Sequence, residues 1–516
     1  MKQDIVINST TSETRIALLE DDQLVEVFVE RPENERMVGS LYKGVVRKVM
    51  VGMSAAFVNI GFQQDAFLHF SDIGGGDNYS MDGVEKDNEN GKSHHSRKRW
   101  EKPDIKTGQE ILVQIIKEPI GTKGPRVSSQ ISMPGRFLVL VPNEAFMGVS
   151  RKIRSFQEKK RLRQVARRIC PKEYGLIIRT QAETKSEDVL RADLDRCIKS
   201  WRKVLAGLKT QKEPGLVYRD MSMASSVIRD LFTPEVNSLV IDSRKQYREI
   251  LSYIKDVAPN LANKILLHSD RIPIFDKFGV ELEIEKSLMR KIWLNGGGYL
   301  YFDQTEALIA IDVNSGRFVG KRDHEDNSLK VNLKAGREIC RQLRLRDIGG
   351  ILVIDFIDMA FQSNRDRLFE EMRQALRMDR AKWDIAPISA FGLMEMTRQR
   401  IRPSLLSTFR EPCPKCEGTG LVPSMETVVT FLERWIKRFG SHTHERRLGL
   451  VLNPKVKDYL SGGINSRIAR IMWNNRVFIT MEVDEDMKIE DFRGYSYKQK
   501  RDVTSDFLVN NIAKSG

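Results

Sequence analysis

Two aspartates stand at the ends of two aliphatic runs in this sequence. Asp312 closes the run in "ALIAIDVNSG", and Asp355 closes the run in "GGILVIDFIDM". A helix-forming stretch separates the runs, so we expect neighbouring strands that carry both acids at their carboxyl ends. Two converging carboxylates repel each other unless a cation lies between them, and a set of oxygen ligands suits Mg²⁺. The pair predicts magnesium-assisted hydrolysis of a phosphodiester, in which the metal generates hydroxide and neutralises negative charge.

The residues around the two acids extend this prediction. Asn314 lies two residues after Asp312, on the same face of an extended chain, where we expect it to orient a carboxylate or the scissile group. The run from Ile351 to Ile354 predicts a strand buried on both faces. Asp358 is interpreted as the cap of the next helix, with a supporting role behind the two metal-binding acids as the alternative. The alternative is that each acid only caps a helix or pairs with a neighbouring arginine.

The composition indicates a large, basic, soluble protein. The chain has 516 residues, too many for one hydrophobic core, so several domains are expected. Its net charge of +15 favours a polyanionic partner, with nucleic acid as the first candidate. No stretch reaches the roughly 20 apolar residues of a membrane span, and "MKQDIVINST" lacks the apolar core of a signal peptide. We therefore expect no membrane span and a cytoplasmic location.

The elements that must position these residues can be outlined. From residue 290 to residue 400 strands and helices alternate, an order typical of α/β sheets that collect ligands at their strand ends. Residues 40–72 and 110–118 contain short β-rich runs, which predict a small barrel. The polar segment 73–104 between them predicts an inserted loop. A Pro/Cys/Gly segment, 403–423, precedes a small C-terminal domain.

The predicted barrel carries candidates for nucleic-acid binding. Phe57 and Phe67 are candidate base-stacking residues on an OB-type barrel, although burial in the barrel core is an equally good reading. Lys117 and Lys123 are placed to contact backbone phosphates. The basic helical stretches 151–168 and 334–346 are interpreted either as RNA contacts or as solvated faces.

Cys413 and Cys416 form the single C-x-x-C pair of the chain, in "EPCPKCEGTG". A structural zinc ion needs four ligands, so the pair predicts a zinc site completed by a second copy of the chain. A redox-active pair is the alternative, but the strand before it and the helix after it are missing. Cys170, Cys197 and Cys340 are interpreted as ordinary buried thiols.

Together these motifs resemble the RNase E/G family of bacterial endoribonucleases, and more closely its short, G-type members. The resemblance covers most of the chain and rests on "AAFVNIG", "GLIIRTQAETKS", "IAIDVNSG", "RLRDIGGILVIDFIDM", "FGLMEMTRQR" and "CPKCEGTG". It implies internal hydrolysis of single-stranded RNA to 5′-phosphate and 3′-hydroxyl ends, in ribosomal RNA maturation and messenger decay in the bacterial cytoplasm. A non-catalytic RNA-binding protein and a DNA nuclease are the rival hypotheses.

The resemblance also implies roles for individual residues. Mg²⁺ is expected on Asp312 and Asp355, with Asn314 assisting, and single-stranded RNA on the barrel. A pocket that favours a 5′-monophosphate over a bulkier triphosphate corresponds to Arg179 and Thr180, with backbone contributions from Gly135 and Val139. The resemblance implies that RNA is bound by Phe57, Phe67, Lys117 and Lys123. It also implies that Cys413 and Cys416 bind a zinc ion shared between two chains.

The fold implied by the resemblance is a multidomain α/β arrangement. The expected parts are an RNase H-like subdomain (1–36 and 224–288), an S1-type OB β-barrel (37–128, with the inserted loop 73–104), a 5′-end sensor subdomain (129–223), a DNase I-like catalytic subdomain (289–402), a zinc-link (403–421) and a small C-terminal α+β dimerisation domain (422–516). A homodimer, pairing further into a tetramer as an open alternative, is expected as the assembly. The resemblance to G-type members implies no disordered scaffold tail for degradosome partners.

Overall fold

The computed structural model describes residues 2–31, 37–73, 84–86, 105–119, 123–142, 144, 146–220, 223–316, 324–400, 402–411, 413–414, 416, 418–462 and 466–508. The chain divides into two compact units, Met1–Thr408 and Phe409–Gly516. The first unit contains four sheets and the second contains one among the described residues. This mixed α/β organisation in several parts confirms the predicted fold class at that level.

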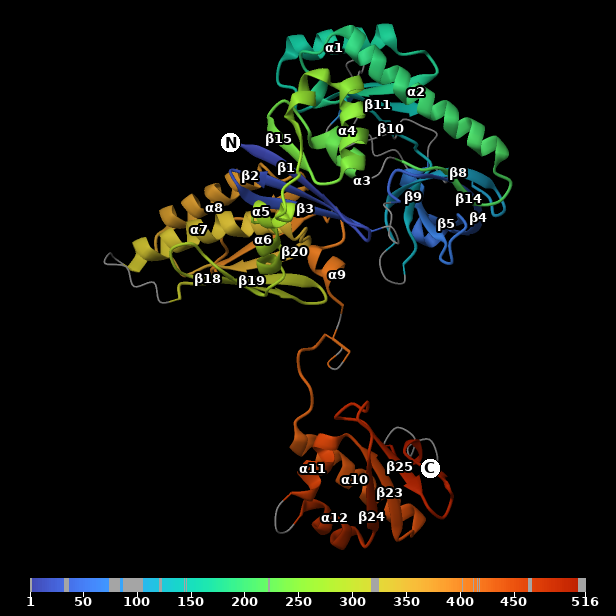
Figure 1. Cartoon of the computed structure of the whole chain (residues 1–516), viewed down its shortest axis with the longest axis vertical. Coiled ribbons are helices and arrows are strands. Elements are labelled where there is room, and N and C mark those ends of the chain that lie inside the picture. Colours follow the sequence, from blue (N-terminus) through green and yellow to red (C-terminus); the bar gives the residue numbers. More distant parts are fainter. Residues whose placement is uncertain are drawn as a thin grey trace. The chain divides into compact units, whose positions relative to one another are not determined.

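The acid-bearing sheet has the strand order β17-β18-β19-β20-β22-β21. Its strands are β17 (Lys291–Trp293), β18 (Tyr299–Gln304), β19 (Leu308–Asn314), β20 (Gly350–Asp355), β22 (Leu393–Arg398) and β21 (Trp383–Ile385). β19 and β20 are parallel, since α7 (His324–Leu345) returns the chain between them. This helix and α8 (Gln362–Leu376) cover one face of the sheet (Figure 1).

Only the helix-covered face of this sheet is buried, and it is mostly apolar. On β20, Leu352 and Ile354 face the helices and are 0% exposed, whereas Ile351 faces the other side of the sheet and is 54% exposed. The prediction of a strand buried on both faces is therefore wrong, because both helices lie on the same side of the sheet and the other side stays open. Asp312 and Asp355 are exposed. Asp355 lies four residues after Ile351 and therefore on the same, open face of the sheet, and its register partner Asp312 lies there too.

A second sheet joins the N-terminus to a much later segment, in the order β16-β15-β1-β2-β3. Its strands are β1 (Gln3–Ser9), β2 (Thr14–Glu20), β3 (Gln23–Glu30), β15 (Val236–Ile241) and β16 (Ile265–Leu267). The helices of this region are α3 (Met223–Leu231), α4 (Arg244–Val257), α5 (Ile274–Lys277) and α6 (Val280–Ser287). β1 pairs parallel to β15, with Ile5 opposite Leu239, and both residues are fully buried.

Five strands close into a barrel, because β4 pairs both with β5 and with β8. They are β4 (Leu41–Met50), β5 (Ala55–Asn59), β6 (Ala66–His69), β9 (Arg126–Ser128) and β8 (Glu110–Lys117). The core contains Val58, Leu68 and Val127, all 0% exposed. The prediction of a small barrel is confirmed, and β14 (Gly215–Tyr218) extends it by pairing with β4.

A further sheet, of order β10-β11-β13-β12-β7, lies with two long helices. Its strands are β10 (Met133–Pro134), β11 (Leu138–Pro142), β12 (Met147–Ser150), β13 (Tyr174–Ile178) and β7 (Val84–Lys86), and the helices are α1 (Phe156–Ile169) and α2 (Glu187–Thr210). β7 comes from the predicted loop 73–104 and pairs with β12. Residues 74–83 and 87–104 of that loop lie outside the described residues.

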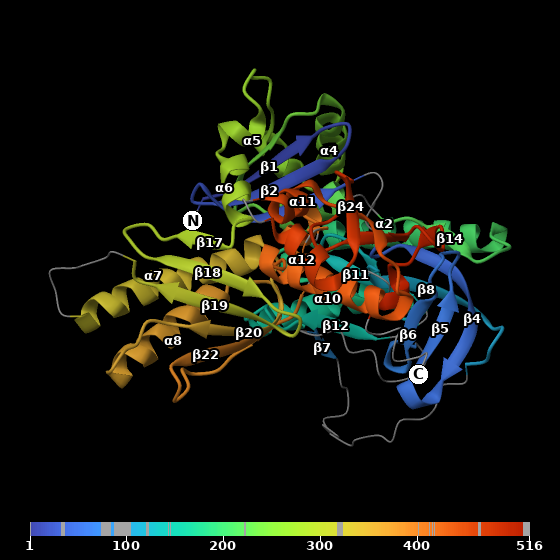
Figure 2. The same ribbon diagram turned by 90° about the horizontal axis from the view of Figure 1, so that it is seen from below.

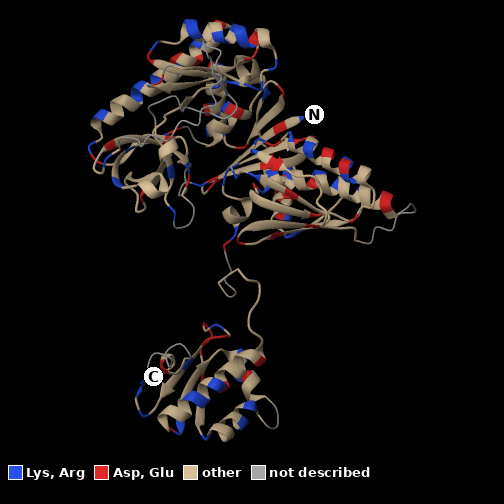
Figure 3. Cartoon of the chain, turned by 180° about the vertical axis from the view of Figure 1, so that it is seen from behind, with Lys and Arg blue, Asp and Glu red and all other residues tan. Residues whose placement is uncertain are grey.

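The predicted basic stretch 334–346 is a solvated face only in part. Lys334 and Arg337 are exposed, whereas two later arginines are buried. Arg344 is 8% exposed and pairs with Glu20 at 2.9 Å and Glu26 at 3.2 Å. Arg346 is 7% exposed and donates to the carbonyl of Met289 at 2.8 Å. Acidic and basic residues are mixed along the helices over the acid-bearing sheet (Figure 3). The second half of α7 therefore joins the acid-bearing sheet to the N-terminal sheet.

The second unit contains a sheet of order β24-β23-β25-β26 with three helices. Its elements are α10 (Met425–Thr443), β23 (Arg447–Leu452), α11 (Pro454–Ser461), α12 (Arg467–Asn475), β24 (Phe478–Val483), β25 (Phe492–Ser496) and β26 (Arg501–Asp502). α9 (Leu405–Phe409) ends where the two units divide. In the described part of the chain, no helix is long and apolar enough to cross a membrane.

Candidate active site

The two predicted acids are direct neighbours. Asp312 and Asp355 are register partners at the ends of the parallel strands β19 and β20, whose spacing is roughly 4.8 Å. The amide nitrogen of Asn314, Nδ2, donates a hydrogen bond to Oδ2 of Asp312 at 2.5 Å. Asn314 thus holds one carboxylate in place, as its spacing from Asp312 predicted. Figure 2 shows β18, β19, β20 and β22 of this sheet, which are neighbours in the strand order.

The electrostatics of the pair favour a cation. Partial burial raises the pKa of Asp355, and the negative charges of Asp312 and Asp358 raise it further. A pKa raised by like charges means that the ionised carboxylates repel one another. A divalent cation between them would remove that repulsion.

Asp358 does not cap the following helix, so that prediction is wrong. The residue before α8 is Phe361, and the backbone N–H groups of Ala360 and Phe361 donate to the carboxylate of Glu325, on α7, at 3.0 and 3.2 Å. Glu325 thus satisfies the donors that Asp358 was expected to bind. Asp358 instead adds its charge to the acid pair.

A buried asparagine on α7 positions the loop that follows Asp355. Asn332 is 0% exposed. Its Nδ2 donates to the carbonyl of Ile357 at 2.7 Å, and its Oδ1 accepts from the N–H of Ile357 at 3.1 Å. Sequence reasoning missed this residue, because nothing local marks an asparagine in a basic helix as a clamp on a distant loop.

The donor set at the acids fits an open magnesium site. No group of three or more His, Cys, Asp or Glu side chains placed to hold a metal occurs in the described ranges. Mg²⁺ needs no such group, because it keeps most of its waters and is commonly held by one or two carboxylates plus a substrate phosphate. Asp312 and Asp355 can supply those two carboxylates.

The aromatic candidates on the barrel lie on its outer face. Phe57 and Phe67 are cross-strand partners on β5 and β6, half-buried, with ring centroids 5.9 Å apart. The reading that both are barrel core is therefore wrong. Phe57 pairs with Lys48 on β4, and Phe67 pairs with Arg126 on β9.

Lys117 completes this series of partners, since it pairs with Arg126 and is exposed. We call Lys48, Phe57, Phe67, Arg126 and Lys117 the barrel row. Arg126 also binds Asp72 at 2.7 Å. Sequence reasoning missed Lys48 because its pairing with Phe57 follows an irregularity in the register of β4 and β5. It missed Arg126 because β6 and β9 are far apart in the chain. Lys123 is exposed in the segment before β9.

Arg179 and Gly135, both predicted for a 5′-phosphate pocket, are in contact. Nη1 of Arg179 donates to the carbonyl of Gly135 at 2.8 Å and pairs with Asp230 at 2.8 Å. The hydroxyl of Thr180 lies 2.9 Å from that of Ser150. Val139 is 5% exposed on β11, so its side chain is in the core.

Charged residues buried around this contact were not predicted. A Cβ on Gly135 would lie 2.4 Å from Oδ2 of Asp193, so the site requires glycine there. Burial alone would raise the pKa of Asp230, but Arg229 and Arg179 lower it. Burial lowers the pKa of Arg136, whose Nη1 has no hydrogen-bond partner in the described chain. The group of charged side chains around Arg179 is therefore basic. One arginine nitrogen in it, Nη1 of Arg136, has no hydrogen-bond partner in the described chain.

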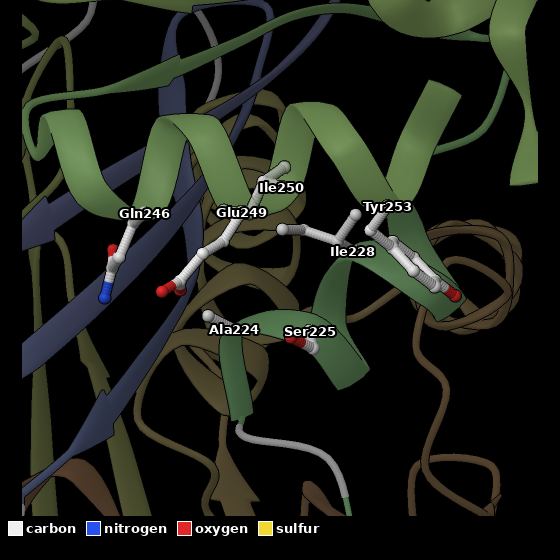
Figure 4. Close-up of a pocket in the computed structure, with 7 residues that line it drawn as sticks. All are labelled: Ala224, Ser225, Ile228, Gln246, Glu249, Ile250 and Tyr253. Atoms are coloured by element: carbon white, nitrogen blue, oxygen red, sulfur yellow. The ribbon is translucent and has the colours of Figure 1, made fainter. Parts of the chain in front are cut away.

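A small pocket of about 80 Å³ lies between α3 and α4 (Figure 4). It is lined by Ala224, Ser225, Ile228, Gln246, Glu249, Ile250 and Tyr253. None of the predicted site residues lines it. The candidate active site is thus an open sheet face rather than this pocket.

The cysteines divide into two kinds. Cys413 is exposed and Cys416 is half-buried, in the segment between α9 and α10. No strand directly precedes the pair and no helix starts directly after it, so the described residues lack the setting of a redox pair. Burial raises the pKa of Cys197 and of Cys340 to about 12, and that of the half-buried Cys170 to about 11.

Comparisons with known proteins show which proteins this chain is similar to. The model of the Ribonuclease E/G family matches residues 132–401, and a model described as the thioredoxin-like domain of RNase E/G matches residues 412–496. The chain is 38% identical to Ribonuclease G of Escherichia coli over 475 residues, 91% of this chain and 95% of that protein. It is 31% identical to Ribonuclease E of Haemophilus influenzae over 522 residues, 100% of this chain and 54% of that protein. It is 37% identical to a chloroplastic ribonuclease E/G-like protein of Arabidopsis thaliana, over 73% of this chain.

Proposed function

Since the chain belongs to the ribonuclease E/G family, we propose that it is a Mg²⁺-dependent endoribonuclease that hydrolyses single-stranded RNA at internal bonds. The relatives named ribonuclease G and ribonuclease E support an endoribonuclease in RNA processing. The observation that carries the site assignment is the direct pairing of Asp312 with Asp355 at the ends of two parallel strands.

The roles of the residues follow from this pairing. Asp312 and Asp355 would hold the metal through one carboxylate each, and Asn314 keeps the carboxylate of Asp312 in its orientation. The clamp of Asn332 on Ile357 holds the loop after Asp355. Held by these two carboxylates, Mg²⁺ would supply the chemistry of activating a water molecule and neutralising charge on the phosphate. Attack on phosphorus with departure of the 3′-oxygen leaves 5′-phosphate and 3′-hydroxyl ends.

Binding of the single strand is assigned to the barrel row. Its aromatic pair gives bases a stacking surface that tolerates any sequence, and its cations attract the phosphates. Lys123 is proposed as a further phosphate contact, because it is exposed just before β9. The net charge of +15 supports a polyanionic substrate.

A preference for 5′-monophosphorylated RNA is proposed for the cluster around Arg179. The guanidinium of Arg179 suits a terminal phosphate, and Thr180 and the backbone of Gly135 and Val139 would complete the pocket. Asp230 binds Arg179 at 2.8 Å without substrate, so the phosphate must displace that carboxylate or share the arginine with it.

The remaining proposals concern assembly and setting. Cys413 and Cys416 would bind one zinc ion together with the same pair of a second chain, giving a homodimer that pairs further into a tetramer as an alternative. The domain boundaries given above stay predictions. Ribosomal RNA maturation and messenger decay in the bacterial cytoplasm are proposed as the physiological setting.

The decisive experiment compares Asp355→Asn with the parent protein on single-stranded RNA and Mg²⁺. We expect the parent to cut internally and the variant to bind the RNA without cutting it. Asp366→Asn, an exposed acid on α8, is the matched control and should cut normally. Equal cutting by Asp355→Asn would refute the site, and binding without cutting by every protein would favour the non-catalytic alternative. Preferred cutting of single-stranded DNA would favour a DNA nuclease.

A further inference from the structure

Three aromatic side chains and a lysine lie beside the acid pair, on strands that the site assignment does not use. Tyr301 of β18 is the register partner of Asp312, and Tyr299 is the partner of Asn314. On β17, Lys291 pairs with Tyr301 and Trp293 pairs with Tyr299. Register partners point to the same side of a sheet, so these four residues share the open face with the acids.

The four side chains form one connected group, which we call the platform. The Nζ of Lys291 lies 3.8 Å from the ring centroid of Tyr299 and 4.1 Å from that of Trp293. The Tyr299 ring lies 5.3 Å from Trp293 and 5.8 Å from Tyr301, with edge-to-face geometry in both pairs. The ammonium group of Lys291 therefore lies among the rings of the platform.

The turn before Tyr299 sets the position of the platform. Gly298 has a φ of +91°, and a Cβ there would lie 2.8 Å from the carbonyl oxygen of Asn314. Only glycine adopts this conformation and allows this approach without strain. The turn therefore brings Tyr299 directly against the strand that carries Asp312.

Packing of the fold does not account for these rings. Trp293 is 68% exposed and Tyr301 is 37% exposed, whereas the alternate residues Ile292 and Leu300 are 8% and 0% exposed and face the core. Exposed clusters of large aromatic residues commonly mark binding sites. Here one row of register partners joins Tyr301 to Asp312, and a second row joins Tyr299 to Asn314.

We propose that Lys291, Trp293, Tyr299 and Tyr301 stack the unpaired bases of the RNA strand on one side of the scissile phosphate. This inference rests on the proposed function. Tyr301, one strand from Asp312, receives the base nearest the cut, and Tyr299 and Trp293 receive the next. Neighbouring strands are roughly 4.8 Å apart, so the platform begins within one nucleotide of the acids. Lys291 offsets the repulsion between the RNA phosphates and the carboxylates.

A nucleic-acid strand fits this face better than a second copy of the chain. The core of a protein interface is depleted of charged residues, yet the platform contains a lysine and ends at two carboxylates. Stacking on aromatic rings beside a cation is how proteins hold single strands without reading their sequence. A site that must cut many transcripts needs this tolerance.

The test removes bases one at a time from the substrate. A series of 5′-monophosphorylated single-stranded RNAs carries one abasic nucleotide at successive positions on either side of a single cleavage site, and kcat/KM is measured with Mg²⁺. For the full-length protein we expect a roughly 5- to 150-fold loss at one to three consecutive positions on one side of the cut. The double variant Trp293→Ala/Tyr301→Ala should show a similar loss on intact RNA and no further loss at those positions.

Two controls keep the result specific. Phe156→Ala removes a ring that is 74% exposed on α1 and should retain both the full rate and the sensitivity to abasic positions. Trp293→Phe with wild-type Tyr301 should retain most of the sensitivity. If the double variant keeps the abasic profile of the parent, or if it only changes the sedimentation coefficient as a lost contact between copies would, the platform proposal is refuted. Failure of the parent to cut RNA at all would instead refute the proposed function.

Discussion

The barrel row and the platform both place aromatic rings beside lysines on a partly exposed face of a β-sheet. They differ in the residues that continue each row of register partners. On the barrel, Phe67 is followed by the cations Arg126 and Lys117. On the acid-bearing sheet, Tyr301 is followed by Asp312 and Asp355. The first row attracts phosphates along its whole length, whereas the second ends in acids that repel a phosphate unless a metal is present.

The difference indicates a division of labour between the two regions. Under the proposed function, affinity for a single strand would come from rings and cations, which do not depend on a metal. Bond breaking would need the acid pair, whose two carboxylates repel each other when no metal is bound. The two regions should therefore fail in different ways when altered, and four predictions use that contrast.

The largest effect is expected for Asp312→Asn on the acid-bearing sheet. If Asp312 is one of two carboxylate ligands, as proposed, its loss removes several kcal/mol of charge stabilisation, so the cutting rate should fall on the order of a thousandfold. RNA affinity, measured by fluorescence anisotropy, should stay within about twofold of the parent if the barrel dominates binding. A large loss of affinity would break the proposed division of labour.

The support of the acid-bearing sheet is the next target. Arg398 of β22 is buried and binds Asp379 at 2.6 Å and Asp347 at 2.9 Å. Arg398→Met leaves the buried carboxylate of Asp379 without its arginine and leaves Asp347 with Arg402 alone, at 3.3 Å. The loss should lower the free energy of unfolding by about 3–5 kcal/mol. Urea denaturation measures this, with Arg373→Met as the control, because Arg373 pairs with Glu370 on the exposed side of α8 and should cost less than about 1 kcal/mol.

On the barrel row, Phe67→Ala should act on binding rather than on chemistry. Loss of one stacked base costs about 1–3 kcal/mol, so the dissociation constant for single-stranded RNA should rise. The rate at saturating RNA should stay close to that of the parent. Phe62→Ala, which removes an exposed ring outside the row, should change neither quantity. A fall in the saturated rate with unchanged affinity would place Phe67 in the chemical step.

The smallest effect is a pH dependence of stability at the acid pair. Burial and the charges of Asp312 and Asp358 raise the pKa of Asp355 in the folded chain, so the native state binds that proton more tightly than the unfolded state. In metal-free protein, this group should therefore stabilise the fold as the pH falls through the window between the pKa of Asp355 in the folded chain and its lower pKa in the unfolded chain. Above that window the stabilisation should be absent. Asp355→Asn should be more stable than the parent at pH 7 without Mg²⁺.

Thermal melts from pH 3 to pH 8 measure the difference in stability between Asp355→Asn and the parent protein. It should vanish below the ordinary aspartate pKa of about 3.9, and added Mg²⁺ should stabilise the parent but not the variant. A variant that is less stable than the parent at neutral pH would mean that Asp355 makes a favourable contact in the metal-free chain.

Several features of the fold and the site could be predicted from the chain alone. Apolar runs that end in Asp312 and Asp355 were enough to predict adjacent parallel strands with both acids at one edge, because a crossover helix leaves few other arrangements. The β-rich runs predicted the barrel. The same local pattern misjudged β20, since four aliphatic residues read alike whether helices cover one face of a sheet or both.

The sequence by itself determined which side chains exist at strand ends and turns, the basic charge and the motifs of the family. Only the tertiary structure decided which of them meet. Lys48 and Arg126 join the barrel row through pairings beside irregularities in the register, and a shift of one residue would turn each to the other face. Asn332 contacts the loop after Asp355 only because α7 packs against the sheet beside the end of β20. Trp293 shares a face with Asn314 only because β17, β18 and β19 pair in this register. Such contacts depend on the summed geometry of whole elements, which no local pattern of residues specifies.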